Sequence, residues 1–472
     1  MQTSFDTVQG NSNDTKFSAR KNSVLPEGLG SKSFQRDYGI KYSYLSGAMY
    51  KGIASTDLVI AMGKAGLMGY LGAGGLRMGD LENAILTIKS ALNNNESYGI
   101  NLLCNTDHPD VEMRTIELFL EHSVKFIEAA AFMRVTPSLV RFRLSGLKKT
   151  ADGKIVAAHK ILAKISRPEV AEGFMRPAPQ KIVDKLLAAG HITSEQAELA
   201  KLIPVAQDIC VEADSGGHTD QGNPYVLMPA IQKLRDRIIA EQGYREEIRV
   251  GAAGGIGTPQ SAAAAFMMRA DFIMTGSINQ CTVEAGTSDT VKDILQEINV
   301  QDTGYAPAGD MFELGAKVQV VKQGLLFATR ANKLYDLYMR HDGLDDLDER
   351  TSLQIQEKYF KKSFDDVWEE TKAYYRRVDP SKVDENKINP KQKMALIFRW
   401  YFVHSTRLAM NGDSEQKVDY QIHCGPALGA FNQWVRDTEL NSWRNRKVAD
   451  IAEKIMCETA ATISLFISEI NE

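Results

Sequence analysis

Short apolar runs alternate with amphipathic segments between residues 42 and 300. The segments between the runs, such as Ala54–Ala65 and Asp80–Leu92, place apolar residues at helical spacing. The runs themselves have the length and composition of buried strands. They are Tyr42–Met49, Leu67–Leu71, Ser97–Leu103, Lys125–Ala130, Lys160–Ile165, Asp208–Ala213, Ile248–Ala252 and Phe272–Thr275. Eight strands that alternate with helices over about 240 residues predict an α/β fold, a (β/α)₈ TIM barrel.

A doubly wound open sheet is the competing architecture for the same alternation. That fold normally carries a Gly-x-Gly-x-x-Gly turn after an early strand. The early Gly72-Ala73-Gly74 has Arg77 where the third glycine should stand. The pattern therefore favours the barrel.

The pattern changes at both ends of the predicted barrel and once within it. Residues 1–35 are rich in Ser, Asn, Thr and Gly, which predicts a mobile N-terminal arm before a barrel domain over residues 36–300. Two short helices are expected in a helical insertion near residues 175–203. Residues 301–472 become aromatic and charged, with long amphipathic segments, and predict a second, mainly helical domain for substrate or docking, packed over or beside the barrel mouth.

Composition narrows the classes of function. A net charge of −4 gives no reason to expect a nucleic-acid-binding or membrane-surface protein. The five cysteines are scattered without a Cys-x-x-Cys spacing, which indicates reduced thiols in a cytoplasmic protein and favours neither a disulfide scaffold nor a zinc site. No metal-binding motif is present, and the polar N-terminus has no apolar signal core.

The segment Asp208–His218 carries the first candidate chemistry. A strand-like run ends in Gly216-Gly217, and His218 follows at once. Barrels place catalytic side chains at the carboxyl ends of their strands, and a histidine there suits general acid–base catalysis. A hydrogen-bonded structural histidine is the alternative. Glu212 and Asp214 face the same way on a strand, so they either orient the histidine, contact a ligand or make polar contacts at the rim.

Two further pairs of small residues follow the last two predicted strands. They are Gly254-Gly255 and Gly276-Ser277. Barrels often bind phosphate at this place through backbone N–H groups. Two pairs at successive strand ends favour a phosphate site over glycines that merely permit turns.

Two polar side chains stand near other strand ends. Asn101 can donate and accept hydrogen bonds, which suits recognition of a ring with alternating carbonyl and N–H groups. Lys164 is either a cation that faces the ligand or a solvated lysine at a strand end.

Eight stretches carry a family resemblance. They are Tyr44–Ala54, Gly72–Leu76, Gly99–Asn101, Ala163–Ala171, Ser215–His218, Gly251–Gly257, Leu314–Gln319 and the more family-specific His423–Asn432. Together they resemble the PfaD-type trans-acting enoyl reductases of polyunsaturated fatty acid and polyketide synthases, and the resemblance covers residues 30 to 470. The barrel part is also similar to flavin-type enoyl-acyl carrier protein reductases and nitronate monooxygenases.

The resemblance implies FMN as cofactor, NADPH as hydride donor and an enoyl thioester on an acyl carrier protein as substrate, with polyketide or fatty acid synthase modules as partners. His218 matches the active-site histidine. The cofactor site would comprise the ring contacts Ala48, Met49 and Asn101, the nearby Lys164 and Gly217, and the phosphate-holding Gly254, Gly255, Gly276 and Ser277. The insertion near residues 175–203 departs from the smaller bacterial reductases.

Two alternative functions stay open at this point. One is a nitronate monooxygenase-type flavin oxidase on the same barrel, and the other is a non-catalytic docking subunit of a synthase. A carrier protein is generally acidic, so we expect a locally basic docking surface, either at Lys361-Lys362 with Arg376-Arg377 or at Arg444, Arg446 and Lys447. A homo-oligomer is compatible with the sequence.

Overall fold

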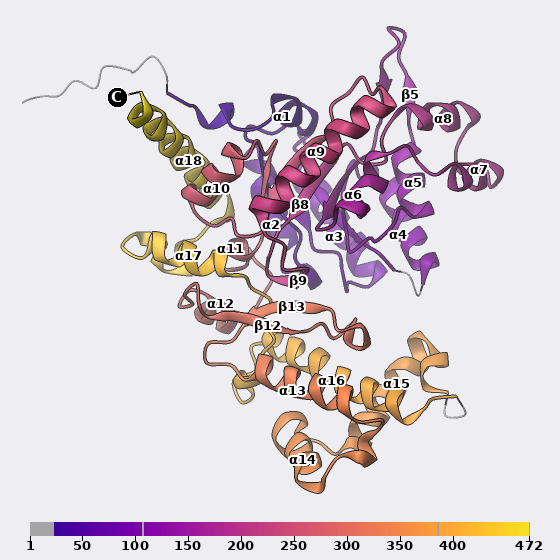
Figure 1. Ribbon diagram of the computed structural model, residues 1–472, viewed down its shortest axis with the longest axis vertical. Coiled ribbons are helices and arrows are strands. Elements are labelled where there is room, and N and C mark those ends of the chain that lie inside the picture. Colours follow the sequence, from indigo (N-terminus) through magenta and orange to yellow (C-terminus); the bar gives the residue numbers. More distant parts are fainter. Residues whose placement is uncertain (1–22, 106–107, 385–386, 472) are drawn as a thin grey trace, which may run out of the picture.

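The centre of the molecule is a closed barrel of eight parallel strands (Figure 1). The computed structural model describes residues 23–105, 108–384 and 387–471. The strands follow one another around the barrel in chain order: β1 (Tyr44–Ser46), β2 (Met68–Leu71), β3 (Gly99–Leu103), β4 (Phe126–Ala130), β7 (Lys160–Ile165), β8 (Asp208–Glu212), β10 (Arg249–Ala253) and β11 (Ile273–Thr275). Each overlaps one of the eight predicted runs, and β10 alone extends past its run, by Ala253, so the predicted barrel is confirmed.

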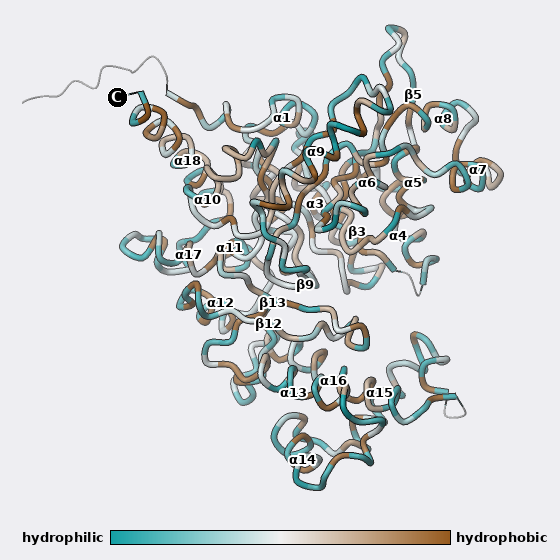
Figure 2. The backbone as a smooth tube through the Cα atoms, in the orientation of Figure 1, coloured by the Kyte–Doolittle hydropathy of each residue, from teal (hydrophilic) through white to brown (hydrophobic). Residues whose placement is uncertain are grey.

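Helices surround the barrel and bury their apolar faces against the strands. Their starts follow from the sequence, since Ser55 accepts a hydrogen bond from the Leu58 amide and Thr258 forms a reciprocal cap with Ser261. In Figure 2 the central strands are mostly pale to brown, whereas the surrounding helices alternate between brown and teal residues. The helices are α2 (Thr56–Lys64), α3 (Met78–Ala91), α4 (Pro109–Glu121), α5 (Pro137–Leu144), α6 (Pro168–Met175), α9 (Pro224–Gln242), α10 (Pro259–Met267), α11 (Ser277–Gln280) and α12 (Asp289–Leu295).

Helix α1 (Lys32–Tyr38) closes the amino-terminal end of the barrel. The Phe34 ring stacks on Phe272, and the Tyr38 ring stacks on Phe126, in both cases deep in the interior. Part of the segment that we expected to be an arm, residues 32–35, belongs to this helix. Residues 26–28 of the expected arm form a 3-10 turn, and residues 1–22 lie outside the described residues.

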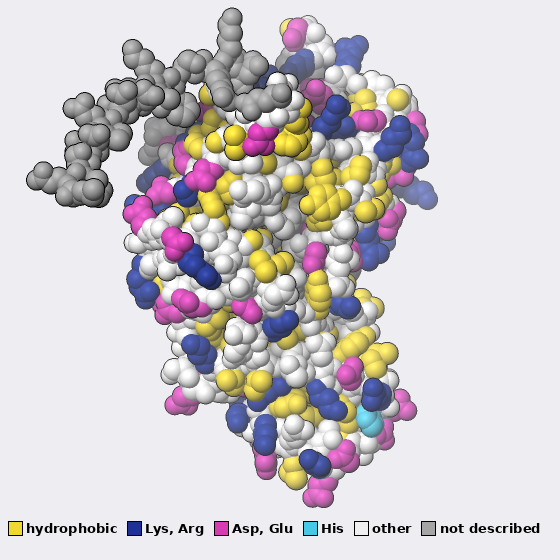
Figure 3. All heavy atoms as spheres, turned by 60° about the vertical axis from the view of Figure 1, so that its left-hand side comes forward, with side chains coloured by type: hydrophobic (Ala, Val, Ile, Leu, Met, Phe, Trp, Pro, Cys, Tyr) yellow, Lys and Arg dark blue, Asp and Glu magenta, His cyan; other side chains and the backbone are white. Residues whose placement is uncertain are grey.

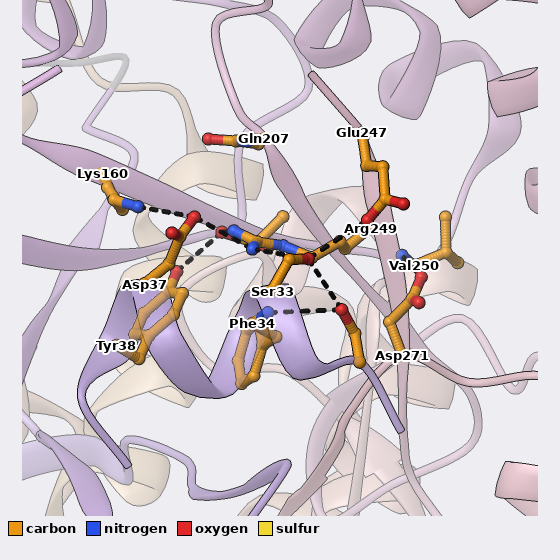
Figure 4. A network of polar contacts seen from close by, with 12 residues as sticks. Ser33, Phe34, Asp37, Tyr38, Lys160, Gln207, Glu247, Arg249, Val250 and Asp271 are labelled. Atoms are coloured by element: carbon orange, nitrogen blue, oxygen red, sulfur yellow. Dashed lines mark hydrogen bonds and ion pairs between the residues drawn. The ribbon is translucent and has the colours of Figure 1, made fainter. Parts of the chain in front are cut away.

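A network of charged side chains lies between α1 and the starts of β7, β8 and β10 (Figure 4). The Arg249 guanidinium binds Asp208 Oδ1 at 2.6 Å and Asp37 Oδ2 at 3.0 Å. Lys160 Nζ lies 2.8 Å from the same Asp37 oxygen, and the Tyr38 hydroxyl donates to Asp208 Oδ2 at 2.9 Å. Arg249 and Asp208 are fully buried, so each charge depends on the other for compensation.

Between β4 and β8 the chain leaves the barrel wall twice. A small hairpin of β5 (Lys148–Lys149) and β6 (Ile155–Val156) precedes β7. Helices α7 (Gln180–Ala188) and α8 (Ser194–Leu199) occupy residues 175–203. Their apolar faces form a separate hydrophobic cluster with α5, which includes Val183, Leu186 and Leu144.

The C-terminal part adds a small sheet and a group of helices at the carboxyl end of the barrel (Figure 1). β12 (Thr303–Pro307), β13 (Lys317–Val321) and β9 (Gly217–Thr219) form an antiparallel sheet, so a loop of the barrel pairs with a strand from beyond residue 300. Next to this sheet lies a second core, built mainly by α13 (Phe327–Arg340), the π-helical segment η6 (Ile355–Phe360), α15 (Phe364–Val378) and α16 (Pro390–Asn411). Helix α14 (Glu349–Gln354) precedes η6 and has no buried residue.

After α16 the chain returns to the barrel. α17 (Pro426–Val435) packs on α11, and α18 (Val448–Ile470) packs on α10 and α2. Buried residues of both helices, among them Phe431 and Ile455, belong to the hydrophobic cluster of the barrel. The domain boundary expected at residue 300 stays a prediction, and the structure adds that residues beyond 420 share the barrel core.

Basic residues of the expected docking surface have different environments. Arg446 is fully buried and donates to the carbonyls of Leu440 and Asn441, so it stabilises the chain locally and was wrongly placed on a docking surface. Arg376 and Arg377 are exposed. On the face drawn in Figure 3, basic and acidic side chains are interspersed.

None of the described helices is both long and apolar enough to cross a bilayer.

Candidate active site

A chain of charged side chains crosses the carboxyl end of the barrel, which we call the mouth. Glu128 on β4, Lys164 on β7 and Glu212 on β8 come from three neighbouring strands. Lys164 Nζ lies 3.1 Å from Glu212 Oε1 and 3.6 Å from Glu128 Oε1. Burial lowers the pKa of Lys164, but the two carboxylates outweigh it and raise that pKa. The lysine is therefore a fixed cation in the mouth.

Glu128 links this chain of charges to the first strand. Its Oε2 accepts a hydrogen bond from the Ala48 amide at 3.0 Å, directly after β1. Its Oε1 is buried and has no hydrogen-bond partner among the described residues. Burial raises the pKa of this carboxyl against the opposing effect of Lys164. A buried carboxylate oxygen that accepts no hydrogen bond, at the centre of the barrel mouth, is a feature of a ligand-binding site.

Asn101 and Met49 complete this side of the mouth. The Asn101 side-chain oxygen accepts from the Ala73 amide at 2.7 Å, and Asn101 pairs with Glu128 across β3 and β4. Met49 is half-buried and packs against the barrel cluster. The four predicted residues belong to one half of the barrel. Ala48 and Met49 follow β1, Asn101 is in the middle of β3, and Lys164 is near the end of β7.

The opposite side of the mouth is lined by glycine backbone. No heavy atom lies within 4 Å of the position that a Cβ would take at Gly255 or Gly276, so both face open space. Gly254 has φ +84°, and a Cβ there would stand 2.7 Å from the Ala213 carbonyl, so only glycine fits. Ser277 Oγ accepts from the Gly425 amide at 3.0 Å, which brings the segment before α17 to this rim.

His218 faces the mouth from the small C-terminal sheet. It lies on β9, where it pairs with Val318, and its Nε2 is 2.8 Å from Asp310 Oδ1. Burial opposes the positive charge, but the hydrogen bond and the charge of Asp310 outweigh burial and raise the pKa of His218. The same contact lowers the pKa of Asp310 against its own burial. The pair therefore favours imidazolium with carboxylate.

The two acidic residues near His218 have other partners. Glu212 binds Lys164, and its charge adds to the rise in the pKa of His218. Asp214 accepts hydrogen bonds from the Thr219 hydroxyl at 2.8 Å and from the Tyr305 hydroxyl. The orienting partner of the histidine is Asp310, which the sequence analysis did not consider.

Other residues at the site were also missed. Glu128 is a single carboxylate in an apolar strand, and that position was the one available signal for it. Asp310 lies 92 residues after His218, so no local pattern connects them. His423 packs near Gly217, and burial, then the charge of His218, lower its pKa to about 4, so it is neutral.

The fold is an eight-stranded (β/α)₈ barrel, and comparisons with known proteins agree with this fold. Over 94% of this chain and 99% of the other, the structure superposes on the enoyl reductase domain of MlnA from the macrolactin biosynthesis cluster of Bacillus amyloliquefaciens, with a TM-score of 0.90 and 45% identity. FabK from Thermotoga maritima shares the fold at 17% identity and a TM-score of 0.55.

The chain belongs to the family of PfaD-type enoyl reductases. Polyketide biosynthesis protein PksE of Bacillus subtilis is 54% identical over 440 residues, which is 93% of this chain and 57% of PksE. A component of the polyunsaturated fatty acid synthase of Thraustochytrium sp. is 45% identical over 88% of this chain and 28% of its own length. The chain thus spans less than two thirds of these relatives.

A family model matches one further segment. Residues 341–420 resemble the inserted helical domain of [acyl-carrier-protein] S-malonyltransferase. The segment corresponds to α14 to α16 and their surroundings, which hold the second core beside the barrel mouth.

Proposed function

We propose that the protein is a trans-acting enoyl reductase that uses FMN and NADPH to reduce the 2,3-double bond of an enoyl thioester on an acyl carrier protein. The observation that carries this proposal is the match to a whole enoyl reductase domain, at 45% identity over 99% of its length. The polyketide and polyunsaturated fatty acid synthase relatives support a synthase as the partner.

The residues of the mouth fit a flavin. The open backbone at Gly255 and Gly276 provides room for a phosphate, beside the Ser277 hydroxyl. Glu128 Oε1 makes no hydrogen bond among the described residues, so it would accept one from an N–H of the ring, and the Lys164 cation lies beside it. A bound FMN would supply the hydride chemistry of the reaction.

His218 would supply the proton. Hydride addition at the β-carbon of an enoyl thioester leaves electron density on the α-carbon, which must take up a proton. His218 Nε2 is held by Asp310, so Nδ1 is the nitrogen left to donate to a substrate in the mouth. Asp310 stabilises the imidazolium form, and it thereby keeps a proton available near neutral pH.

The raised pKa of His218 also weighs against the alternative of a nitronate monooxygenase-type oxidase. Such an oxidase needs a base to convert a neutral nitroalkane into its nitronate, and that base must be neutral before it takes the proton. A histidine whose pKa is raised by a carboxylate is more often charged and serves better as an acid.

The visible spectrum of the purified protein tests the proposal. We expect bound FMN that is bleached by NADPH without oxygen and recovers its colour when an enoyl thioester is added. A protein that cannot be reconstituted with FMN, or whose reduced flavin is re-oxidised by oxygen and not by the thioester, would contradict the proposal.

A further inference from the structure

Two cationic side chains lie where the barrel mouth meets the C-terminal helices. Lys51 is in the turn after β1, and its amide donates to the Gly74 carbonyl at 2.8 Å, so the turn covers the end of β2. Arg407 is exposed on the C-terminal half of α16. The two residues come from opposite sides of the junction.

A short loop holds these two elements together. The Gly286 amide donates to the Ile53 carbonyl at 2.9 Å, and the Ser288 hydroxyl donates to the Ala409 carbonyl at 2.7 Å. Ile53 is two residues after Lys51, and Ala409 is two residues after Arg407. The loop therefore fixes the turn of Lys51 beside the helix of Arg407.

Lys51 and Arg407 are close enough for their charges to interact. Burial, and then the charge of Arg407, lower the pKa of Lys51. Among the described residues the structure pairs neither cation with an acidic side chain, and Lys51 Nζ lies 5.5 Å from the centre of the Tyr50 ring. Two neighbouring cations that lack a counter-charge attract an anion.

The cation pair, Lys51 with Arg407, is on the same side of the mouth as His218. Arg399, Val403 and Arg407 are spaced by four residues and share one face of α16. Arg399 donates to the Asp310 carbonyl at 3.4 Å, and Asp310 binds His218. Eight residues of helix span about 12 Å, so this face runs from the acid–base pair to Arg407.

Tyr50 is near both the His218–Asp310 pair and the cation pair. Burial raises the pKa of its hydroxyl, the charge of Asp310 raises it further, and the charge of Arg407 lowers it. The hydroxyl would lie 2.9 Å from a Cβ built on Gly75, so the ring covers the glycines after β2. Tyr50 is therefore near enough to both pairs for their charges to act on it.

We propose that Lys51 and Arg407 bind a phosphate group of a ligand that enters the barrel mouth. The inference rests on the proposed function, which supplies two such ligands. One is the 4′-phosphopantetheine arm that carries the enoyl thioester, and the other is NADPH. The phosphate chemistry is common to both, and kinetics separates them.

The test uses Lys51→Gln, Arg407→Gln and the double variant. The matched control is the double variant Lys233→Gln with Arg350→Gln, which removes one exposed cation from α9 and one from α14. Each protein is assayed with an enoyl thioester of pantetheine, the same thioester of 4′-phosphopantetheine, NADPH and NADH.

We expect the double variant to raise one KM by about tenfold and each single variant to raise it by about three- to fivefold, with kcat little changed. A rise for the 4′-phosphopantetheine thioester but not for the pantetheine thioester assigns the site to the carrier arm. A rise for NADPH but not for NADH assigns it to the dinucleotide. The control should leave each KM unchanged.

Calorimetric titration with 4′-phosphopantetheine and with adenosine 2′,5′-bisphosphate measures the same site without turnover. If the unaltered protein reduces no enoyl thioester, the proposed function fails, and this titration still decides the inference. Unchanged KM values and unchanged binding in the double variant would overturn the phosphate site.

Discussion

The two ends of the barrel use buried charges differently. At the amino-terminal end, Arg249 is bound by Asp208 and Asp37, and each partner has a further contact. At the mouth, Glu128 keeps one buried oxygen without a donor, and His218 is half-exposed. Saturated contacts suit a structural role, whereas unsatisfied and accessible groups suit a ligand.

The largest effect is expected from breaking the amino-terminal network. Arg249→Met leaves Asp208 charged and buried without its main partner, which should lower the free energy of unfolding by about 3–5 kcal/mol. Urea titration followed by circular dichroism measures this. Arg237→Met removes exposed ion pairs with Glu172 and Glu241, and it should lower the free energy of unfolding by only about 0–1 kcal/mol. Equal losses would mean that burial does not distinguish the two arginines.

Removing His218, the proposed proton donor at the mouth, should change catalysis and leave the stability of the protein unchanged. His218→Ala should retain FMN and still be bleached by NADPH, since the histidine is needed after the flavin is reduced. Re-oxidation by the enoyl thioester should slow by roughly 10²–10⁴-fold. Stopped-flow absorbance measures both half-reactions, and the exposed His191→Ala is the control. An unchanged second half-reaction would show that another group donates the proton.

A substitution at Gly255, on the glycine-lined side of the mouth, should have a smaller effect that is confined to FMN binding. Gly255→Val should yield folded protein that binds FMN at least about tenfold more weakly, because the side chain would fill the space next to the expected phosphate. Gly190→Val is the matched control, since Gly190 has the same φ of +72° and equally open surroundings, far away in the insertion. Flavin fluorescence titration compares them. Full FMN affinity in the Gly255 variant would place the phosphate elsewhere.

The sequence predicted what depends on local patterns. All eight strands were found because each is a short apolar run, and the glycines of the mouth were found because they end those runs. The pairing of His218 with Asp310 was missed because it depends on how β9 and β13 meet. Likewise, the amphipathic pattern of α18 indicates a buried face but not that α10 covers it. Residues that are distant in sequence are brought together by packing, which periodicity does not encode.

The pairing of His218 with Asp310 gives the prediction with the smallest expected effect. Asp310→Asn keeps an oxygen that accepts from His218 but removes the charge that raises the histidine pKa, so that pKa should fall. The reaction requires the protonated form, so activity is present below this pKa and is lost as the pH rises through it. The loss in the variant should therefore begin at a lower pH than in the unaltered protein.

The dependence of kcat/KM on pH, with the enoyl thioester varied, measures the shift in the free enzyme. Asp310→Glu, which restores the charge, should return the profile toward that of the unaltered protein. FMN content and bleaching by NADPH should be the same in all three proteins, which separates an effect on the proton donor from damage to the mouth. If the Asn variant lost activity equally at every pH, Asp310 would support the fold of the β12–β13 hairpin and would not set the protonation of His218.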